Sequence, residues 1–86
     1  MQQFSYVIQD KDGVHARPAG RIIQSARGIK SEVTIEAKGR KISLKDGIFA
    51  LMGMGIRCGE EVIVSCSGED ETVALDTIRK SFEENL

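Results

Sequence analysis

The stretch from Asp12 to Gly20, Asp-Gly-Val-His-Ala-Arg-Pro-Ala-Gly, marks the point where the sequence changes from a strand pattern to a helix pattern. It contains the only histidine of the chain, His15, and the only proline, Pro18. Asp12-Gly13 is a turn signal, and proline is accepted in the first turn of a helix, where its missing N–H is not needed. We therefore predict that a strand ends before this stretch and that a helix begins at Pro18.

Outward from this stretch, the chain switches between the two-residue period of strands and the longer period of amphipathic helices. Alternating apolar residues predict strands over residues 4–9, 32–37 and 61–67, and the Lys38-Gly39 turn predicts a β-hairpin whose second strand carries Ile42 and Leu44. Helical spacing predicts a helix from Pro18 to about Gly28, a short one over 48–54 and a third over 71–84.

This order, βαββαβα, predicts an α+β fold in which the helices cover one face of the sheet. The 86 residues suffice for one small domain, which we expect to span 1–86. The expected core-facing positions are Ala19, Ile22, Ile23 and Ala26 on the first helix and Ala74, Leu75, Ile78 and Phe82 on the last.

Charge and composition exclude several function classes. Twelve basic residues against thirteen acidic ones give a net charge of −1, which offers no electrostatic basis for binding nucleic acid or an anionic membrane. No apolar run is long enough to cross a bilayer, and the first ten residues lack the features of a signal peptide. We expect a cytoplasmic protein without a nucleic-acid partner and without membrane insertion.

The two cysteines, Cys58 and Cys66, do not have the spacing of a metal-binding cluster. With one histidine in the chain we expect no metal site, and in a reducing cytosol we expect no disulfide. Cys66 shares the apolar face of its predicted strand with Val62 and Val64, so we expect it in the core.

His15 lies immediately before the predicted helix, whose free N–H groups form an anion-binding terminus. Ala16, Arg17 and Pro18 make up this terminus, and the guanidinium of Arg17 offers a fork of donors suited to phosphate. The helix dipole disfavours the imidazolium form, and neutral imidazole has a nucleophilic ring nitrogen. These features predict a site for a phosphoryl group carried on histidine. The alternative, a histidine that merely ends a loop, stays open on the residues alone, and Asp10 and Asp12 are interpreted as turn residues.

The run Gly-Val-His-Ala-Arg-Pro-Ala from Gly13 to Ala19 resembles the active-site signature of the HPr family, the histidine-containing phosphocarriers of the bacterial sugar phosphotransferase system (PTS). The resemblance extends over essentially the whole chain. It implies an open-faced β-sandwich, with a four-stranded antiparallel sheet and three helices on one face. It also implies that Nδ1 of His15 accepts a phosphoryl group from enzyme I and passes it to sugar-specific IIA proteins or domains. Arg17 would neutralise the phosphate, and no cofactor is implied.

The apolar segment Ile-Phe-Ala-Leu-Met-Gly-Met-Gly from Ile48 to Gly55 exceeds what a small core needs. The resemblance suggests that part of it forms an exposed docking patch beside the active site, framed by the first helix. The expected docking residues are Gly20, Arg21, Arg27, Ile48, Phe49 and Met52. Core packing for Ile48, Leu51 and Met52, and a merely solvated helix face for the two arginines, remain open as alternatives.

Many relatives from Gram-positive bacteria carry a regulatory serine just before this apolar segment. Counting from His15 places Asp46 there, whereas matching the apolar pattern places Gly47 there, so neither alignment supplies a hydroxyl group. Ser43 lies upstream, in the predicted hairpin strand. We expect the kinase-dependent regulation to be absent, and we expect Asp46 to cap the following helix, with phosphoserine mimicry as the alternative.

Two functions from different classes remain at this point. The first is a phosphocarrier in sugar uptake, and the second is a paralogue that acts in a regulatory phosphorelay or as a docking module. The intact His15-Ala16-Arg17-Pro18 run favours phosphoryl chemistry over docking alone. A small charged chain with transient partners is expected to be a monomer.

Overall fold

Four strands form one antiparallel sheet in the order β1-β4-β2-β3 in the computed structural model, which describes residues 1–86. The strands are β1 (Gln2–Val7), β2 (Glu32–Ala37), β3 (Arg40–Ser43) and β4 (Glu61–Ser67). The helices are α1 (Ala16–Ser25), α2 (Ile48–Gly53) and α3 (Glu71–Asn85), and a single 3₁₀ turn, η1 (Leu44–Asp46), precedes α2. The element order is therefore βαββαβα, as expected.

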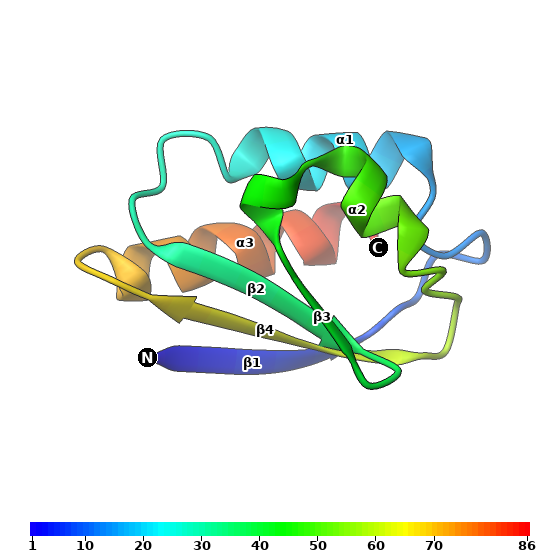
Figure 1. Cartoon of the computed structure of the whole chain (residues 1–86). Helices are drawn as coiled ribbons and strands as arrows, with labels where there is room; N and C mark the ends of the chain where they lie inside the picture. The colour runs from blue at the N-terminus through cyan, green and yellow to red at the C-terminus, as the bar shows by residue number, and fades with distance from the viewer.

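The three helices lie on one side of the sheet and leave its other face open (Figure 1). Because successive side chains of a strand point to opposite faces, Val33, Ile35 and Ala37 of β2 are buried against the helices, while Glu32 and Glu36 are exposed. This arrangement confirms the open-faced sandwich. No helix has both the length and the apolar character needed to span a bilayer.

The core lies between the sheet and the helices and follows the sheet register. Val64 of β4 pairs with Phe4 of β1 on one side and with Ile35 of β2 on the other, so three apolar side chains lie in one row. Phe82 of α3 is 1% exposed and meets the rings of Phe4 and Tyr6 edge-on at centroid distances of 5.9 and 5.6 Å. Edge-to-face pairs of this kind stabilise beyond the apolar area they bury.

The helix faces follow the predicted stripes. Ala19 and Ile22 of α1 and Ile78 of α3 are fully buried, and Ala74 and Leu75 are nearly so. Apolar residues at this spacing share one side of a helix, so burial of that side stabilises both the helix and its position on the sheet.

Several predicted boundaries are wrong by two to four residues. The first strand covers Gln2–Val7 rather than 4–9, and α1 begins at Ala16 rather than Pro18 and ends at Ser25, before Gly28. Pro18 is the third residue of α1, still within the first turn, where no intrahelical N–H bond is lost. Leu44 does not continue the hairpin strand, because the chain turns there into η1.

Both cysteines are free thiols. Cys58 is exposed, whereas Cys66 is buried in β4 as expected, and burial raises the pKa of its thiol above the ordinary value. Cys66 is thus a core residue because it is fully buried. It is not a reactive thiol, because a thiol held in its protonated form is a poor nucleophile.

Candidate functional site

The loop between β1 and α1 is attached to the loop that precedes β4. The N–H of Val14 donates a hydrogen bond to the carbonyl oxygen of Ile56 at 3.0 Å. The preceding residue, Gly13, lies close to this carbonyl group and has a φ of +68°. A Cβ at Gly13 would lie 2.4 Å from the same oxygen. Glycine is therefore required here by backbone conformation and by close approach, and it fixes where the next residues emerge.

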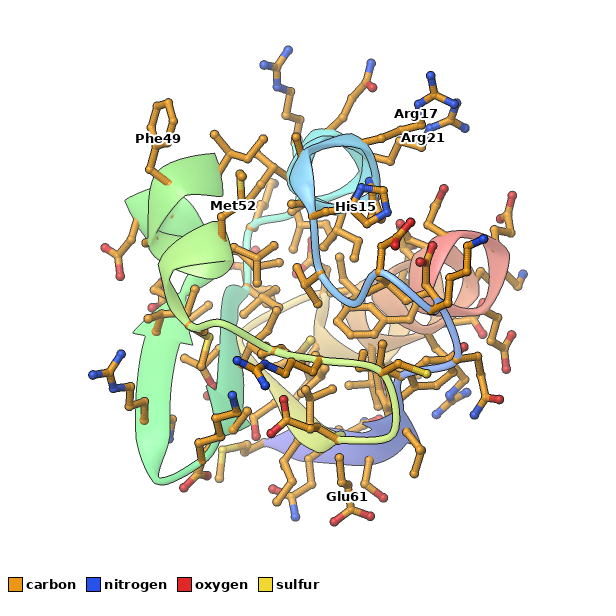
Figure 2. All side chains as sticks on the ribbon, turned by 90° about the vertical axis from the view of Figure 1, so that its right-hand side faces the viewer. His15, Arg17, Arg21, Phe49, Met52 and Glu61 are labelled. Carbon is orange, nitrogen blue, oxygen red and sulfur yellow. The ribbon has the colours of Figure 1, made fainter.

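His15 follows this anchor as the N-cap residue of α1. Its backbone is extended, its side chain makes no capping hydrogen bond, and the imidazole is 40% exposed. The helix offers no acceptor to the N–H groups of Ala16 and Arg17, and Pro18 has none. The exposed ring therefore lies at a helix terminus that favours an anion (Figure 2).

Arg17 and Arg21 lie one turn apart on α1 and line the same polar depression as His15. Both are exposed, and neither makes a salt bridge. Figure 2 shows both side chains extending from the same side of α1 as the imidazole. Two uncompensated cations at this position are available to neutralise a bound phosphoryl group.

The loop between β1 and α1 and the last turn of α3 form the rest of this depression. Its further lining residues are Asp10, Lys11, Asp12, Pro18, Glu84 and Asn85. The walls are polar, and the depression is open, so it suits transient contact with a charged group rather than enclosure of an apolar ligand.

The apolar segment divides into a buried side and an exposed side. Leu51 is 1% exposed and belongs to the core, whereas Phe49 is 84% exposed. Ile48 and Met52 are half-buried and pack against the core. Figure 2 shows Phe49 pointing away from the molecule, while Met52 lies between α2 and the end of α1 that carries His15. Core packing thus applies to Leu51, whereas exposure to possible partners applies to Phe49 on the same helix.

Two of the expected docking residues, Gly20 and Arg27, do not line the depression around His15. A Cβ at Gly20 would contact Cδ1 of Ile48 at 3.6 Å, so Gly20 lies at the contact between α1 and α2. Arg27 follows the end of α1, about 15 Å along the helix axis from its first residue. It lines a separate cleft beside Ile23 and Leu44. Arg27 therefore does not belong to the depression around His15.

Asp46 does not cap α2, which corrects the expectation from the sequence. Its carboxylate accepts a hydrogen bond from the backbone N–H of Ser43 at 3.1 Å, and the hydroxyl oxygen of Ser43 accepts one from Lys45 N–H at 3.2 Å. This reciprocal pair is a capping box at the N-terminus of η1. The N-cap of α2 is Gly47, with a φ of +93° that side-chain-bearing residues rarely adopt.

Asp10 is the contact that the sequence did not reveal. Its Oδ2 lies 3.5 Å from Nε2 of His15. Aspartate is common in turns, and the sequence does not show which of Asp10 and Asp12 turns toward the imidazole. Ligand-type atoms of these three side chains all lie within 4.8 Å of one another, but exposed acidic groups often lie so close without an ion, and we assign no metal to them.

Residues 2–84 match the family model described as the PTS HPr component phosphorylation site. Among solved structures, a histidine-containing phosphocarrier protein of Mycoplasma is similar with 34% identity and a TM-score of 0.92, over 96% of this chain and 93% of that one. HPr of Thermoanaerobacter tengcongensis is similar with 30% identity and a TM-score of 0.90, over 99% and 94%.

A third similar structure is the catabolite repression protein Crh of Bacillus subtilis, described as a dimer with a swapped domain. Its identity is 34% and its TM-score is 0.75, over 100% of this chain and 98% of that one. The family model covers nearly the whole sequence, and the fold agrees with the similar phosphocarrier structures at TM-scores of 0.92 and 0.90. The chain therefore belongs to the HPr family of phosphocarriers of the bacterial phosphotransferase system.

Proposed function

We propose that this chain accepts a phosphoryl group on His15 from phosphorylated enzyme I and passes it to IIA proteins or domains for sugar uptake. The observation that carries the proposal is the exposed imidazole at the free N-terminus of α1, beside two unpaired arginines. A carrier has to present its phosphoryl group to successive partners, so an open site is an advantage. The proposed partners place this activity in the cytoplasm.

The chemistry needs little covalent machinery from this chain. The lone pair of Nδ1 attacks the phosphorus atom carried by enzyme I, a new N–P bond forms, and the bonding electrons of the old P–N bond return to the donor nitrogen. Nε2 faces Asp10, which leaves Nδ1 as the ring nitrogen for attack. Arg17, supported by the amides of the first turn, neutralises the developing charge, and the partner supplies the alignment.

We propose that partners dock on the exposed side of α2 beside this site. Phe49 is the largest exposed apolar side chain in that helix, and Ile48 and Met52 border it. Methionine adapts to differently shaped surfaces, which suits a protein that meets several partners in turn. Of the two arginines expected at the docking surface, Arg21 lies near enough to contribute, because it shares the depression with His15, whereas Arg27 does not.

The test is incubation with enzyme I and labelled phosphoenolpyruvate, followed by addition of a IIA protein. We expect an acid-labile, base-stable label on the wild type, no label on His15→Ala, and passage of the label to the IIA protein. Arg17→Ala should accept the label about tenfold more slowly, because it removes a donor from the phosphoryl site, with an unchanged melting temperature. Equal labelling of His15→Ala would refute the carrier role.

A regulatory phosphorelay is the second candidate, and it is supported by the similarity to Crh and by the absence of a hydroxyl group at Asp46 and Gly47. This candidate predicts labelling by enzyme I without onward passage to IIA proteins. Under both candidates we expect no serine phosphate after incubation with HPr kinase and ATP. Stoichiometric phosphorylation of Ser43 or any other serine would contradict that expectation.

We propose that the chain is a monomer. All six residues of β1 pair with β4 of the same chain, so the sheet is complete within one copy. HPr of Thermoanaerobacter tengcongensis has been described as a dimer, and Crh as a swapped one, so the measurement is informative. Sedimentation equilibrium should give a mass of 9.4 kDa, and twice that mass would overturn the proposal.

A further inference from the structure

The orientation of the His15 imidazole depends on few contacts. The backbone of His15 is fixed, since its N–H donates to the carbonyl oxygen of Gly13 at 3.1 Å and its own carbonyl accepts from Ala19 N–H at 3.0 Å. The side chain, in contrast, makes no capping hydrogen bond. Its one charged contact is with Oδ2 of Asp10, at 3.5 Å from Nε2.

Asp10 is itself held firmly. Its Oδ1 accepts a hydrogen bond from Asp12 N–H at 2.8 Å, its backbone N–H donates to the carbonyl oxygen of Leu86 at 2.7 Å, and its carbonyl accepts from Gly13 N–H at 2.9 Å. These bonds join Asp10 to its own turn and to the end of the chain after α3. One carboxylate oxygen is thus committed to the turn, and the other is left for the imidazole.

We propose that Asp10 is a positioning residue for phosphoryl transfer at His15, an inference that rests on the proposed function. Its Oδ2, 3.5 Å from Nε2, is placed to accept from Nε2–H and so to favour the tautomer in which Nδ1 carries the lone pair. When Nδ1 forms the N–P bond, the ring gains positive charge, which the carboxylate compensates. The Nε2 proton stays in place throughout. When the phosphoryl group moves on, the positive charge of the ring supports departure of Nδ1, because the ring leaves as neutral imidazole.

The distance of 3.5 Å is at the outer limit of a hydrogen bond, and such contacts often shorten when a partner closes the site. Asp12 is the neighbouring carboxylate, but it is exposed and forms no ion pair with His15. The other charged groups around the depression are Lys11 on the loop, Arg17 and Arg21 on α1, and Glu84 on α3. Asp76 on α3 carries the same charge outside this depression and is paired only with Arg79 and Lys80, so it provides a matched control.

The experiment compares Asp10→Asn with Asp76→Asn in the full chain. An asparagine at position 10 has one carbonyl oxygen, which can serve either the turn or the imidazole but not both. The first readout is the ¹⁵N NMR spectrum of the His15 ring at alkaline pH, without any partner. We expect the proton on Nε2 in the wild type and in Asp76→Asn, and a tautomer mixture in Asp10→Asn.

The second readout is the rate of phosphoryl transfer from enzyme I. We expect Asp10→Asn to be about threefold to fivefold slower than the wild type, the range for a partly exposed charged pair, and Asp76→Asn to be unchanged. Identical tautomers and rates in the two variants overturn the proposal, as does a rate loss without a tautomer change. Failure of the wild type to accept phosphate defeats the proposed function instead, while the NMR readout still decides whether Asp10 sets the tautomer.

Discussion

At the scale of single residues, the position of His15, and with it the proposed phosphoryl site, depends on Gly13. Its backbone lies in the left-handed region, and its α-carbon passes so close to Ile56 that no side chain fits. The following residue, Val14, bonds to the same carbonyl group. His15 therefore emerges at a point fixed by a loop more than forty residues away in the sequence.

The Gly13→Ala variant should show this constraint. We expect a loss in the free energy of unfolding that exceeds the loss in Gly39→Ala by about 1 kcal/mol or more, because only position 13 adds a steric clash. Gly39 has a similar φ of +76° with nothing within 4 Å of an added Cβ, so it reports backbone strain alone, about 1 to 2 kcal/mol. Urea denaturation measures both, and equal losses would contradict the role assigned to Ile56.

At the scale of elements, α2 illustrates how one short helix serves two purposes. Six residues cannot form a stable helix alone, so α2 depends on burial of Leu51. Its opposite side carries Phe49, which stabilises nothing within the chain. The helix is thus anchored by one residue, and another is left available for partners.

Alanine substitutions in α2 should separate these purposes. Leu51→Ala should lower the free energy of unfolding by about 2 to 5 kcal/mol, because it leaves a cavity in the core. Phe49→Ala should change stability by less than about 0.5 kcal/mol, yet slow phosphoryl transfer from enzyme I. Thermal unfolding and the transfer assay provide the two measurements, and unimpaired transfer by Phe49→Ala would remove it from the docking surface.

At the scale of the whole molecule, Asp70 joins two connections that lie far apart in the sequence. Its carboxylate accepts hydrogen bonds from the N–H groups of Lys30 and Ser31, at 2.9 and 2.8 Å, and from the Ser31 hydroxyl. These bonds, with the Ser31 hydroxyl contributing most, hold the pKa of Asp70 below its ordinary value of 3.8. The chain between α1 and β2 is thereby fastened to the turn before α3.

The hydrogen bonds to Asp70 predict that part of the free energy of unfolding is lost in acid. Because the pKa of Asp70 is lower in the folded state, its contribution is complete above pH 3.8 and is lost as pH falls through the folded pKa. Asp70→Asn should therefore be less stable at neutral pH and lose less stability on acidification. Asp76→Asn, which removes an exposed carboxylate paired only with Arg79 and Lys80, should keep the wild-type pH dependence.

Urea midpoints measured from neutral to strongly acidic pH test this prediction. If Asp70→Asn shows the same pH dependence as the wild type, the hydrogen bonds to Asp70 contribute no pH-dependent stability. The same experiment on Ser31→Ala should give a partial effect, because the two backbone donors remain.

The element order and most core residues could be predicted because they depend on periodicity. Alternation placed Val62, Val64 and Cys66 on one buried face, and helical spacing placed Ile78 and Phe82 against it. Boundaries were less accurate, as at α1 and Leu44, because helix ends depend on local hydrogen bonds rather than on period. The capping box between Ser43 and Asp46 is one such competing local bond.

The amino-acid sequence by itself determined the fold class, the histidine and the arginine of the site, since each follows from residue type and short-range spacing. Only the tertiary structure decided which aspartate faces His15, that Gly20 packs under Ile48, and that Arg27 lies outside the site. The physical reason is that these relations join residues through turns and between elements. Such distances depend on how the whole chain packs, and periodicity along one element carries no information about them.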